Sequence, residues 1–409
     1  MASTLESTGR PQAAQGLSAQ VELQALCICA RVHLPEDARQ RLESLVGQGL
    51  DWPLLHQLAR RHRMVPLLHR HLKACCPDAV PVDLMQKLHQ ASQQIAFRNL
   101  TLASGLIKLI RSFQKEGIDS IPYKGPVLAE LAYGDLALRH FDDLDIIVRP
   151  GDLDRARQLI LAEGYKPYPY EELGGLFTEN SCHNIYNHPG PDFNLELHWA
   201  LVPSYFPLAF KRQRLWQRLR HIPFGGLTVL GQSREDLVLA LCIHGGKHHW
   251  LRLSWIVDVA ELLRQHHDLN WEFLVNEAAR LRCKRLLLLG IWLAVNVLQA
   301  PVPASVSDLL SRDPVVPLLG AEVWEGIANR EEVSWAGIKN VAFVCRAREC
   351  SRDRVAYLFM RTFTPTQLEA TWRHLPRPLY FLYSPLRGMR LAVQHGRALL
   401  KRLLLGAKK

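Results

Sequence analysis

The 409-residue sequence lacks any hydrophobic run long enough to cross a membrane as a helix. Such a helix needs about 20 predominantly apolar residues, and the longest apolar run here, Leu286 to Val295, is much shorter. The first twenty residues also lack the apolar segment of a secretory signal, and they are polar and without periodicity. These absences predict a disordered leader, residues 1–20, and a cytoplasmic protein.

The sequence also lacks the C-x-x-C spacing that is common in metal sites, although it contains nine cysteines. Nine is an odd number, and several of these cysteines fall inside segments with helical patterns. Disulfide frameworks belong mainly to secreted chains, whose cysteines are paired. We therefore expect reduced thiols, as in a cytoplasm.

Acidic residues are absent after Glu369, and this absence explains most of the net charge of +11. The last forty residues carry nine Lys and Arg, so the other 369 residues are near neutral, at +2. A nucleic-acid-binding body would carry a basic patch or stripe of its own, so this body argues against a nucleic-acid partner. The basic tail, residues 386–409, favours either weak contact with an anionic membrane surface or a terminal helix docked on the body.

The patterning along the chain predicts three regions between the leader and the tail, and an α+β fold. Residues 21–116 show helical spacing, including a long segment from Val82 to Lys115. Residues 117–230 change to short apolar strands, turns with Pro and Gly and a helix, which indicates a mixed α/β domain. Residues 231–385 return to helical patterns after a capping box at Ser233.

The stretch "DDLDIIV", residues 142–148, places carboxylates at the start of an apolar strand. Because side chains alternate along a strand, Asp143 and Asp145 share one face. On the later strand "FNLELHW", Glu196 lies on the face opposite the apolar residues. Three such carboxylates can hold Mg²⁺, which prefers oxygen ligands, or the two metal ions of phosphoryl-transfer sites. The alternative is solvated surface charge on a loop and a hairpin.

Several motifs follow one another along the sequence. They are a predicted strand, Lys-Gly, a helix, R-x-x-x-D-x-D, a helix ending in Gly-Tyr, and L-E-L-H-W. This order resembles the DNA-polymerase-β-type nucleotidyltransferase superfamily, and more narrowly an uncharacterised nucleotidyltransferase family of bacterial biosynthetic and polysaccharide gene neighbourhoods. A second block, residues 241–263, is similar to the helical segment that follows the catalytic sheet in that family. The residues that carry the resemblance are Lys124, Gly125, Tyr133, Arg139, Asp143, Asp145, Gly164, Tyr165, Glu196, His198 and Trp199.

The resemblance implies a polymerase-β-like mixed sheet with helical domains before and after it. It implies that Asp143 and Asp145 ligate Mg²⁺, as two ions, and that Glu196 joins the catalytic metal and helps to deprotonate an acceptor hydroxyl. The expected reaction is in-line attack on the α-phosphorus of an NTP such as ATP, with release of pyrophosphate, an EC 2.7.7-type activity. Positioning and charge neutralisation carry the rate of such reactions.

One motif departs from the wider superfamily, which has Gly-Ser before the carboxylates. This chain has Lys124-Gly125-Pro126 instead. Pro126 offers no backbone N–H to a phosphate, whereas Lys124 can bind phosphate as a point charge. The family's nucleotide-binding turn is therefore assigned to Lys124 and Gly125, and the identity of the donor is left open.

Further candidate residues lie on both sides of the carboxylates. Arg139 suits either a phosphate clamp or an ion pair with Asp142 or Asp135. A helix continuing through Gly245-Gly246 would align three cationic or titratable side chains on one face. They would contact substrate, pack between domains or, as a weaker alternative, hold a metal; they are His244, Lys247 and His248.

Asp258 lies within the apolar stretch "WIVDVAELL". A buried hydrogen bond, or an ion pair with Lys247 or Arg252, explains it better than catalysis does.

Together these patterns predict an Mg²⁺-dependent nucleotidyltransferase that moves an NMP group from an NTP to a hydroxyl of a small molecule, sugar or peptide. Two alternatives stay open. The same site could use another nucleotide-activated donor, for example in sugar transfer, or the chain could be a non-catalytic, nucleotide-binding regulatory module of the toxin–antitoxin kind.

Overall fold

The computed structural model describes residues 21–168, 182–188, 190, 193–203, 206, 208, 212–329, 337–365 and 375–393. The predicted leader and residues 394–409 of the predicted tail lie outside this part. The composition of residues 189–192 predicts a hairpin turn, and positions 189, 191 and 192 also lie outside this part.

The N-terminal part is helical, as its spacing predicts. Asp51 caps the third helix by accepting a hydrogen bond from the backbone N–H of Leu54 at 2.9 Å. The long fifth helix ends just before Gly117, whose φ of +66° suits glycine. The helices are α1 (Val21–Ile28), α2 (Glu36–Gly47), α3 (Trp52–Arg61), α4 (Val65–Cys75) and α5 (Val82–Lys115).

A five-stranded mixed sheet follows, with the strand order β1-β2-β5-β4-β3. β2 and β5 are parallel neighbours at its centre, and the other pairs are antiparallel. Pro122 ends the edge strand β1, a place where a missing backbone N–H is tolerated. The strands are β1 (Ser120–Pro122), β2 (Asp143–Val148), β3 (Lys166–Pro167), β4 (His183–Asn187) and β5 (Asn194–His198).

Short helices and a separate hairpin surround this sheet. A helical turn, α6 (Gly125–Leu128), continues into a π-helical turn (Ala129–Tyr133) between β1 and β2. α7 (Leu153–Ala162) follows β2, after a 3₁₀ turn (Pro150–Asp152). The remaining elements of this region are α8 (Arg212–Gln217) and the antiparallel pair β6 (Arg220–Phe224) and β7 (Leu227–Gly231).

The C-terminal part is again helical. Ser233 caps its first helix through a hydrogen bond from the backbone N–H of Asp236, at 3.1 Å, as the sequence predicts. The helices are α9 (Arg234–Lys247), α10 (Leu253–Gln265), α11 (Trp271–Arg280), α12 (Lys284–Leu298), α13 (Ala304–Arg312), α14 (Val315–Ala328), α15 (Ile338–Arg346) and α16 (Ser351–Phe363), followed by a 3₁₀ segment (Arg377–Leu382).

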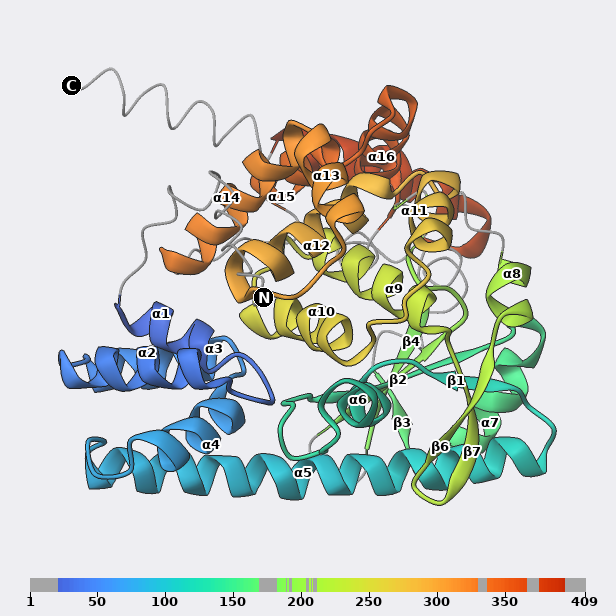
Figure 1. The fold of residues 1–409 in the computed structure, drawn as a ribbon. Helices are drawn as coiled ribbons and strands as arrows, with labels where there is room; N and C mark the ends of the chain where they lie inside the picture. The colour runs from blue at the N-terminus through green and yellow to red at the C-terminus, as the bar shows by residue number, and fades with distance from the viewer. Residues whose placement is uncertain are drawn as a thin grey trace.

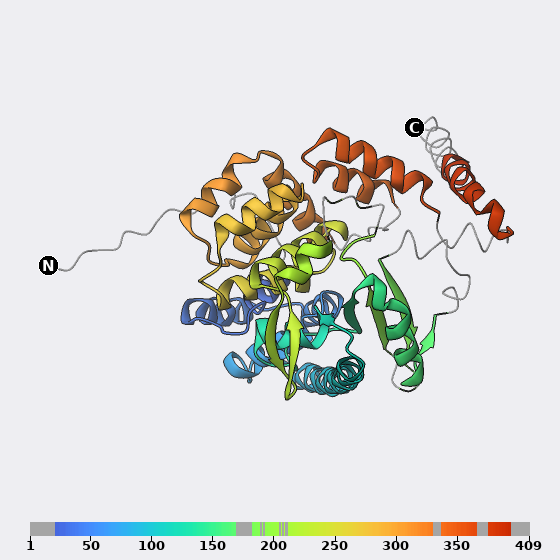
Figure 2. The same cartoon turned by 90° about the vertical axis from the view of Figure 1, so that its right-hand side faces the viewer.

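The elements form layers around the sheet. In Figure 1, α5 runs beneath the N-terminal helices at one end and beneath the sheet and the β6–β7 hairpin at the other. Figure 1 and the turned view in Figure 2 show α9, α10 and α12 in the middle of the molecule, between α5 and the later helices α13, α15 and α16. Buried residues of the N-terminal and C-terminal helices form one contiguous cluster, and a second cluster joins the sheet to α5 and α7. The domain boundaries stay a prediction.

The helices of the described part include none that is both long enough and apolar enough to cross a membrane.

Candidate active site

The three carboxylates predicted from the sequence lie on the two central strands of the sheet. β2 carries Asp143 and Asp145, and β5 carries Glu196. The parallel register places Asp145 opposite Glu196. Ligand atoms of these two carboxylates and of His198 all lie within 4.8 Å of one another. The structure thus brings Asp145 and Glu196 together, whereas their metal-binding and catalytic roles stay predictions.

The alternation of each strand explains why the acids share one face. Leu144 and Ile146 of β2, like Leu195 and Leu197 of β5, are buried in the cluster shared with α5 and α7. The residues between them point to the opposite face, where α9 approaches the site. Apolar burial on one side therefore fixes the acids on the other.

Of the three acids predicted to bind metal, Asp143 is the one whose pKa is raised. Burial, and then the negative charges of Asp145 and Glu196, raise its pKa to about 6. Lys124 and Arg63 oppose this rise without cancelling it. Because like charges raise one another's pKa at short range, this shift indicates a site that favours an added positive charge.

Asp145 is compensated by two cations. Its Oδ1 lies 3.6 Å from Nζ of Lys124 and 3.0 Å from Nε2 of His198. Burial alone would raise the pKa of Asp145, but the charge of Lys124 and the hydrogen bond from His198 hold it below its usual value. Asp145 is therefore ionised while Asp143 is the more readily protonated acid of the pair.

His198 connects the two strands' carboxylates. Its Nε2 lies 3.2 Å from Oε2 of Glu196 as well as 3.0 Å from Oδ1 of Asp145. Burial would lower the pKa of His198, but Tyr123 and the hydrogen bonds to its acidic neighbours raise it well above its usual value. The sequence resemblance includes His198, but no role for it was predicted.

Lys124 and Gly125 form the turn between β1 and α6. Gly125 has a φ of +52°, and a Cβ there would lie 3.2 Å from the backbone oxygen of Asp143. Glycine is required because the backbone is left-handed and close to the start of β2. Lys124 also lies over the ring of Tyr123, at 4.7 Å from its centroid. The motif therefore places the ammonium group of Lys124 beside the carboxylates.

The C-terminal end of α9 forms the opposite side of the site. The helix continues through Gly245-Gly246 to Lys247, so His244 and Lys247 lie on one face, and the rings of His244 and His248 are 4.5 Å apart. Burial, and then the charge of Lys124, lowers the pKa of His244, and burial also lowers that of Lys247. Within the described residues Lys247 makes no ion pair, although it acts electrostatically with Glu196 and Asp145.

The ion-pair partners predicted for Arg139 and Asp258 are wrong, whereas the buried hydrogen bond predicted for Asp258 is confirmed. Arg139 donates two hydrogen bonds to Asp258, at 2.7 and 2.9 Å, and both side chains are buried. Tyr133 also donates to Asp258, at 2.8 Å. This pair joins the turn before β2 to α10, and the phosphate-clamp role of Arg139 stays a prediction.

Asp142 has other partners than the predicted one. Arg63, from the turn between α3 and α4, donates to its carboxylate, and Arg98 of α5 lies 3.4 Å away. Burial would raise the pKa of Asp142, but a hydrogen bond from His140 and the charge of Arg63 hold it well below its usual range. Sequence reasoning missed Arg63 and Arg98, because their separation from Asp142 along the chain leaves no local signal.

Cys182 and His183 are two further neighbours that sequence reasoning missed. The β4–β5 register places His183 opposite His198, and the Cys182 sulfur lies 3.4 Å from Nδ1 of His183. Burial would raise the pKa of Cys182, but the hydrogen bond to His183 and the nearby imidazole of His198 lower it to about 5. The composition of residues 189–192 predicts a hairpin turn between these strands, but the register that brings the two residues to the site had no local signal.

The acids fit a hard divalent cation. Asp145 Oδ2 is buried and has no hydrogen-bond partner among the described residues, so an oxygen is available for a ligand. Mg²⁺ favours such carboxylate oxygens together with substrate phosphates. Asp143, Asp145 and Glu196 are the residues that would hold it.

Comparison with known proteins agrees with this geometry. A family model described as an uncharacterised nucleotidyltransferase matches residues 48–299, which is more than half of the chain and includes every carboxylate of the site. Searches of curated proteins and of solved structures found no match. The chain belongs to the uncharacterised nucleotidyltransferase family.

Proposed function

We propose that the protein is an Mg²⁺-dependent transferase that moves an NMP group from an NTP to a hydroxyl of a small molecule, sugar or peptide. The observation that carries the proposal is that Asp145 and Glu196 lie opposite each other on parallel strands. Asp143 lies two residues before Asp145, on the same face of β2. The family membership supports the class of reaction. We also infer that the sheet is of the polymerase-β type. The expected metal site of that fold takes two acids from one strand and a third from the neighbouring strand, as found here.

Each group has a distinct task in this mechanism. Mg²⁺, when bound by the three carboxylates, would neutralise phosphate charge. Lys124 and Lys247 bind and orient the anionic phosphates from the turn after β1 and from α9. Glu196, beside His198, accepts the proton of the acceptor hydroxyl.

The chemical step balances without a further reactant. The acceptor oxygen forms a bond to the α-phosphorus, and the bond from that phosphorus to the leaving oxygen of pyrophosphate breaks. The hydroxyl proton passes to Glu196 and then to solvent. Arg139 acts only by holding the turn before β2 against Asp258.

The near-neutral body favours a small acceptor over a nucleic-acid template. Nine of the eleven net positive charges belong to the last forty residues, so the body carries too little excess charge for the basic stripe that tracks a phosphate backbone. A small molecule, sugar or peptide needs no such stripe.

The test measures label transfer from α-³²P-labelled NTPs. The full-length protein is incubated with Mg²⁺, each NTP and a small-molecule extract, and pyrophosphate release and labelled products are followed. Asp145→Asn and Glu196→Gln should each lower the rate by at least about 100-fold, because each removes a group that acts in the transition state. Asp154→Asn, an exposed acid of α7, is the matched control and should leave the rate unchanged.

Thermal stabilisation by Mg²⁺ with each NTP separates the remaining outcomes. Stabilisation without any turnover would contradict the enzyme and favour a nucleotide-binding regulatory module. Turnover with a nucleotide sugar, and with no NTP, would show that the donor is a nucleotide-activated sugar. Full activity in Asp145→Asn would overturn the assignment of the site.

A further inference from the structure

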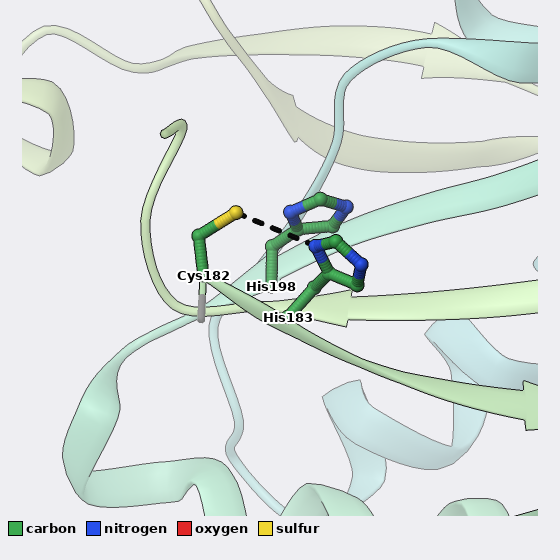
Figure 3. A group of neighbouring side chains, drawn as sticks. All are labelled: Cys182, His183 and His198. Carbon is green, nitrogen blue, oxygen red and sulfur yellow. Dashed lines mark hydrogen bonds between the residues drawn. The ribbon is translucent and has the colours of Figure 1, made fainter. Parts of the chain in front are cut away.

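A second group of potential metal ligands lies directly beside the carboxylates. Cys182 precedes β4, His183 begins it, and His198 ends β5. Ligand atoms of these three residues all lie within 4.8 Å of one another. Figure 3 shows the Cys182 sulfur lying beside both imidazole rings, whose centroids are 4.8 Å apart.

The two imidazoles face the carboxylates with the same ring nitrogen. His198 Nε2 lies 3.2 Å from Oε2 of Glu196, and His183 Nε2 lies 3.8 Å from the same oxygen. On the other edge of its ring, His183 Nδ1 contacts the Cys182 sulfur. His198 Nδ1 is buried and has no hydrogen-bond partner among the described residues.

This arrangement is the one that metal-binding histidines adopt. A histidine that ligates a metal almost always donates its other N–H to a carboxylate or carbonyl, which fixes the ring and its tautomer. Here Glu196 and Asp145 hold Nε2 of His198, and Glu196 lies near Nε2 of His183. The Nδ1 atoms of His183 and His198 are the nitrogens that would ligate the metal together with the thiol.

We propose that Cys182, His183 and His198 form a site for Zn²⁺, distinct from the carboxylate site for Mg²⁺. One sulfur and two imidazole nitrogens suit zinc, whereas Mg²⁺ prefers oxygen. Three protein ligands leave a fourth tetrahedral position for water or another small ligand. On binding, Cys182 bonds as thiolate, and any proton carried by its sulfur or by the two ligating ring nitrogens passes to solvent.

The site is both buried and reachable. Cys182 and His198 are 2% and 3% exposed, which shields the metal–thiolate bond, while the side chain of His183 is 27% exposed and offers a route for the ion. Zinc would hold both rings in place and so fix the hydrogen bond to Oε2 of Glu196. The proposal goes beyond the transferase function, since zinc binding can be measured without turnover.

The experiment uses Co²⁺ as a spectroscopic probe of the full-length protein. Apo protein titrated with Co²⁺ should bind it with a thiolate-to-cobalt charge-transfer band, and Zn²⁺ should displace it with loss of the band. Cys182→Ser should abolish the band, and His183→Ala should weaken Co²⁺ binding at least about tenfold. Cys350→Ser, at an exposed cysteine, is the matched control and should keep both the charge-transfer band and the wild-type affinity for Co²⁺.

The neighbouring acids separate this site from the carboxylate site. Glu196→Gln should keep the band, with somewhat weaker binding, because Glu196 only orients the rings. A band that survives Cys182→Ser would place the ion at another cysteine. Binding that is lost in Glu196→Gln and intact in Cys182→Ser would place it on Asp145, Glu196 and His198. Either result would overturn the proposal.

A measurement on the wild-type chain covers the case in which Cys182→Ser does not fold. Zn²⁺ should protect Cys182 from alkylation by iodoacetamide, as located by peptide mass spectrometry, while Cys350 stays reactive. Equal labelling of Cys182 with and without Zn²⁺ would contradict the site.

Discussion

His62 shows how one buried titratable residue joins two distant helical segments. It follows α3, and its Nδ1 accepts a hydrogen bond at 3.2 Å from the backbone N–H of Leu253, the first residue of α10. The accepting nitrogen must be unprotonated, so the neutral imidazole is the form that fits. Burial, and then the charges of Arg61 and Arg252, lowers the pKa of His62 to about 4.

The lowered pKa of His62 predicts a loss of stability in mild acid. Between pH 6.5 and about 4 the unfolded chain binds a proton at this histidine that the folded chain does not. The free energy of unfolding should therefore fall by about 3 kcal/mol as the pH drops through that window, with no further loss from His62 below it. Urea unfolding at a series of pH values measures this slope.

The variant His62→Asn should flatten the slope, because its amide oxygen can accept from Leu253 without titrating. His33→Asn, at an exposed histidine, is the control and should keep the wild-type slope. An unchanged slope in His62→Asn would show that other groups cause the acid sensitivity.

Alternation within single strands was predictable, and contacts between distant residues were not. The apolar residues of β2 and β5 identified the face of Asp143, Asp145 and Glu196, because burial of one face dictates the other. The partner of Arg139 could not be chosen, since Asp258 lies 119 positions along the chain and nearer acids compete for the same guanidinium. Tertiary packing decides such pairs.

At the scale of elements, α9 reaches the site because two glycines let other elements pack closely against it. Trp250 follows α9 in a left-handed backbone conformation, with a φ of +49°, and its ring is fully buried. A Cβ at Gly245 would lie 2.5 Å from that ring, and one at Gly246 would lie 2.5 Å from Leu286 of α12. The closeness of these contacts positions His244 and Lys247.

Gly245→Ala should destabilise the protein by about 1–3 kcal/mol, because a rigid indole ring must move to admit the methyl group. The matched control is Gly326→Ala in α14, where a Cβ would meet nothing within 4 Å. That variant should stabilise by about 0.5–1 kcal/mol through helix propensity. Denaturant unfolding measures both, and equal effects would contradict the packing argument.

The sequence predicted the type and the ends of many helices and strands, but not which elements lie next to one another. The caps at Asp51 and Ser233 and the glycine after α5 marked helix ends correctly, since these signals are local. The insertion of β5 between β2 and β4 has no local signal, because hydrophobic pairing across the whole sheet selects it. Consequently the Cys182–His183 corner could be seen only once the register was known.

At the scale of the whole molecule, the first and last helical parts share their core. Leu26 of α1 is fully buried in the cluster that includes α9, α10, α12 and α14. Arg31 also donates to the backbone oxygen of Leu298, the last residue of α12, at 3.3 Å. Segments more than 260 residues apart are therefore one structural unit.

Leu26→Ala should lower the free energy of unfolding by about 2–5 kcal/mol, the cost of a cavity in a core. Helix circular dichroism and tryptophan fluorescence should report the same single, shifted transition. Val82→Ala, at a position 71% exposed on α5, should change the value by less than about 0.5 kcal/mol. Two separate transitions in Leu26→Ala would show that the N-terminal helices unfold on their own.

The opposite signs of charge on the two sides of the site have a consequence for how ligands enter. Carboxylates lie on β2 and β5, while Lys124 and Lys247 approach from the turn after β1 and from α9. Phosphates arriving alone would be repelled by the carboxylates, and a metal ion arriving alone would be repelled by the lysines. Only the two together restore neutrality, so donor and ion should enter cooperatively, as one complex.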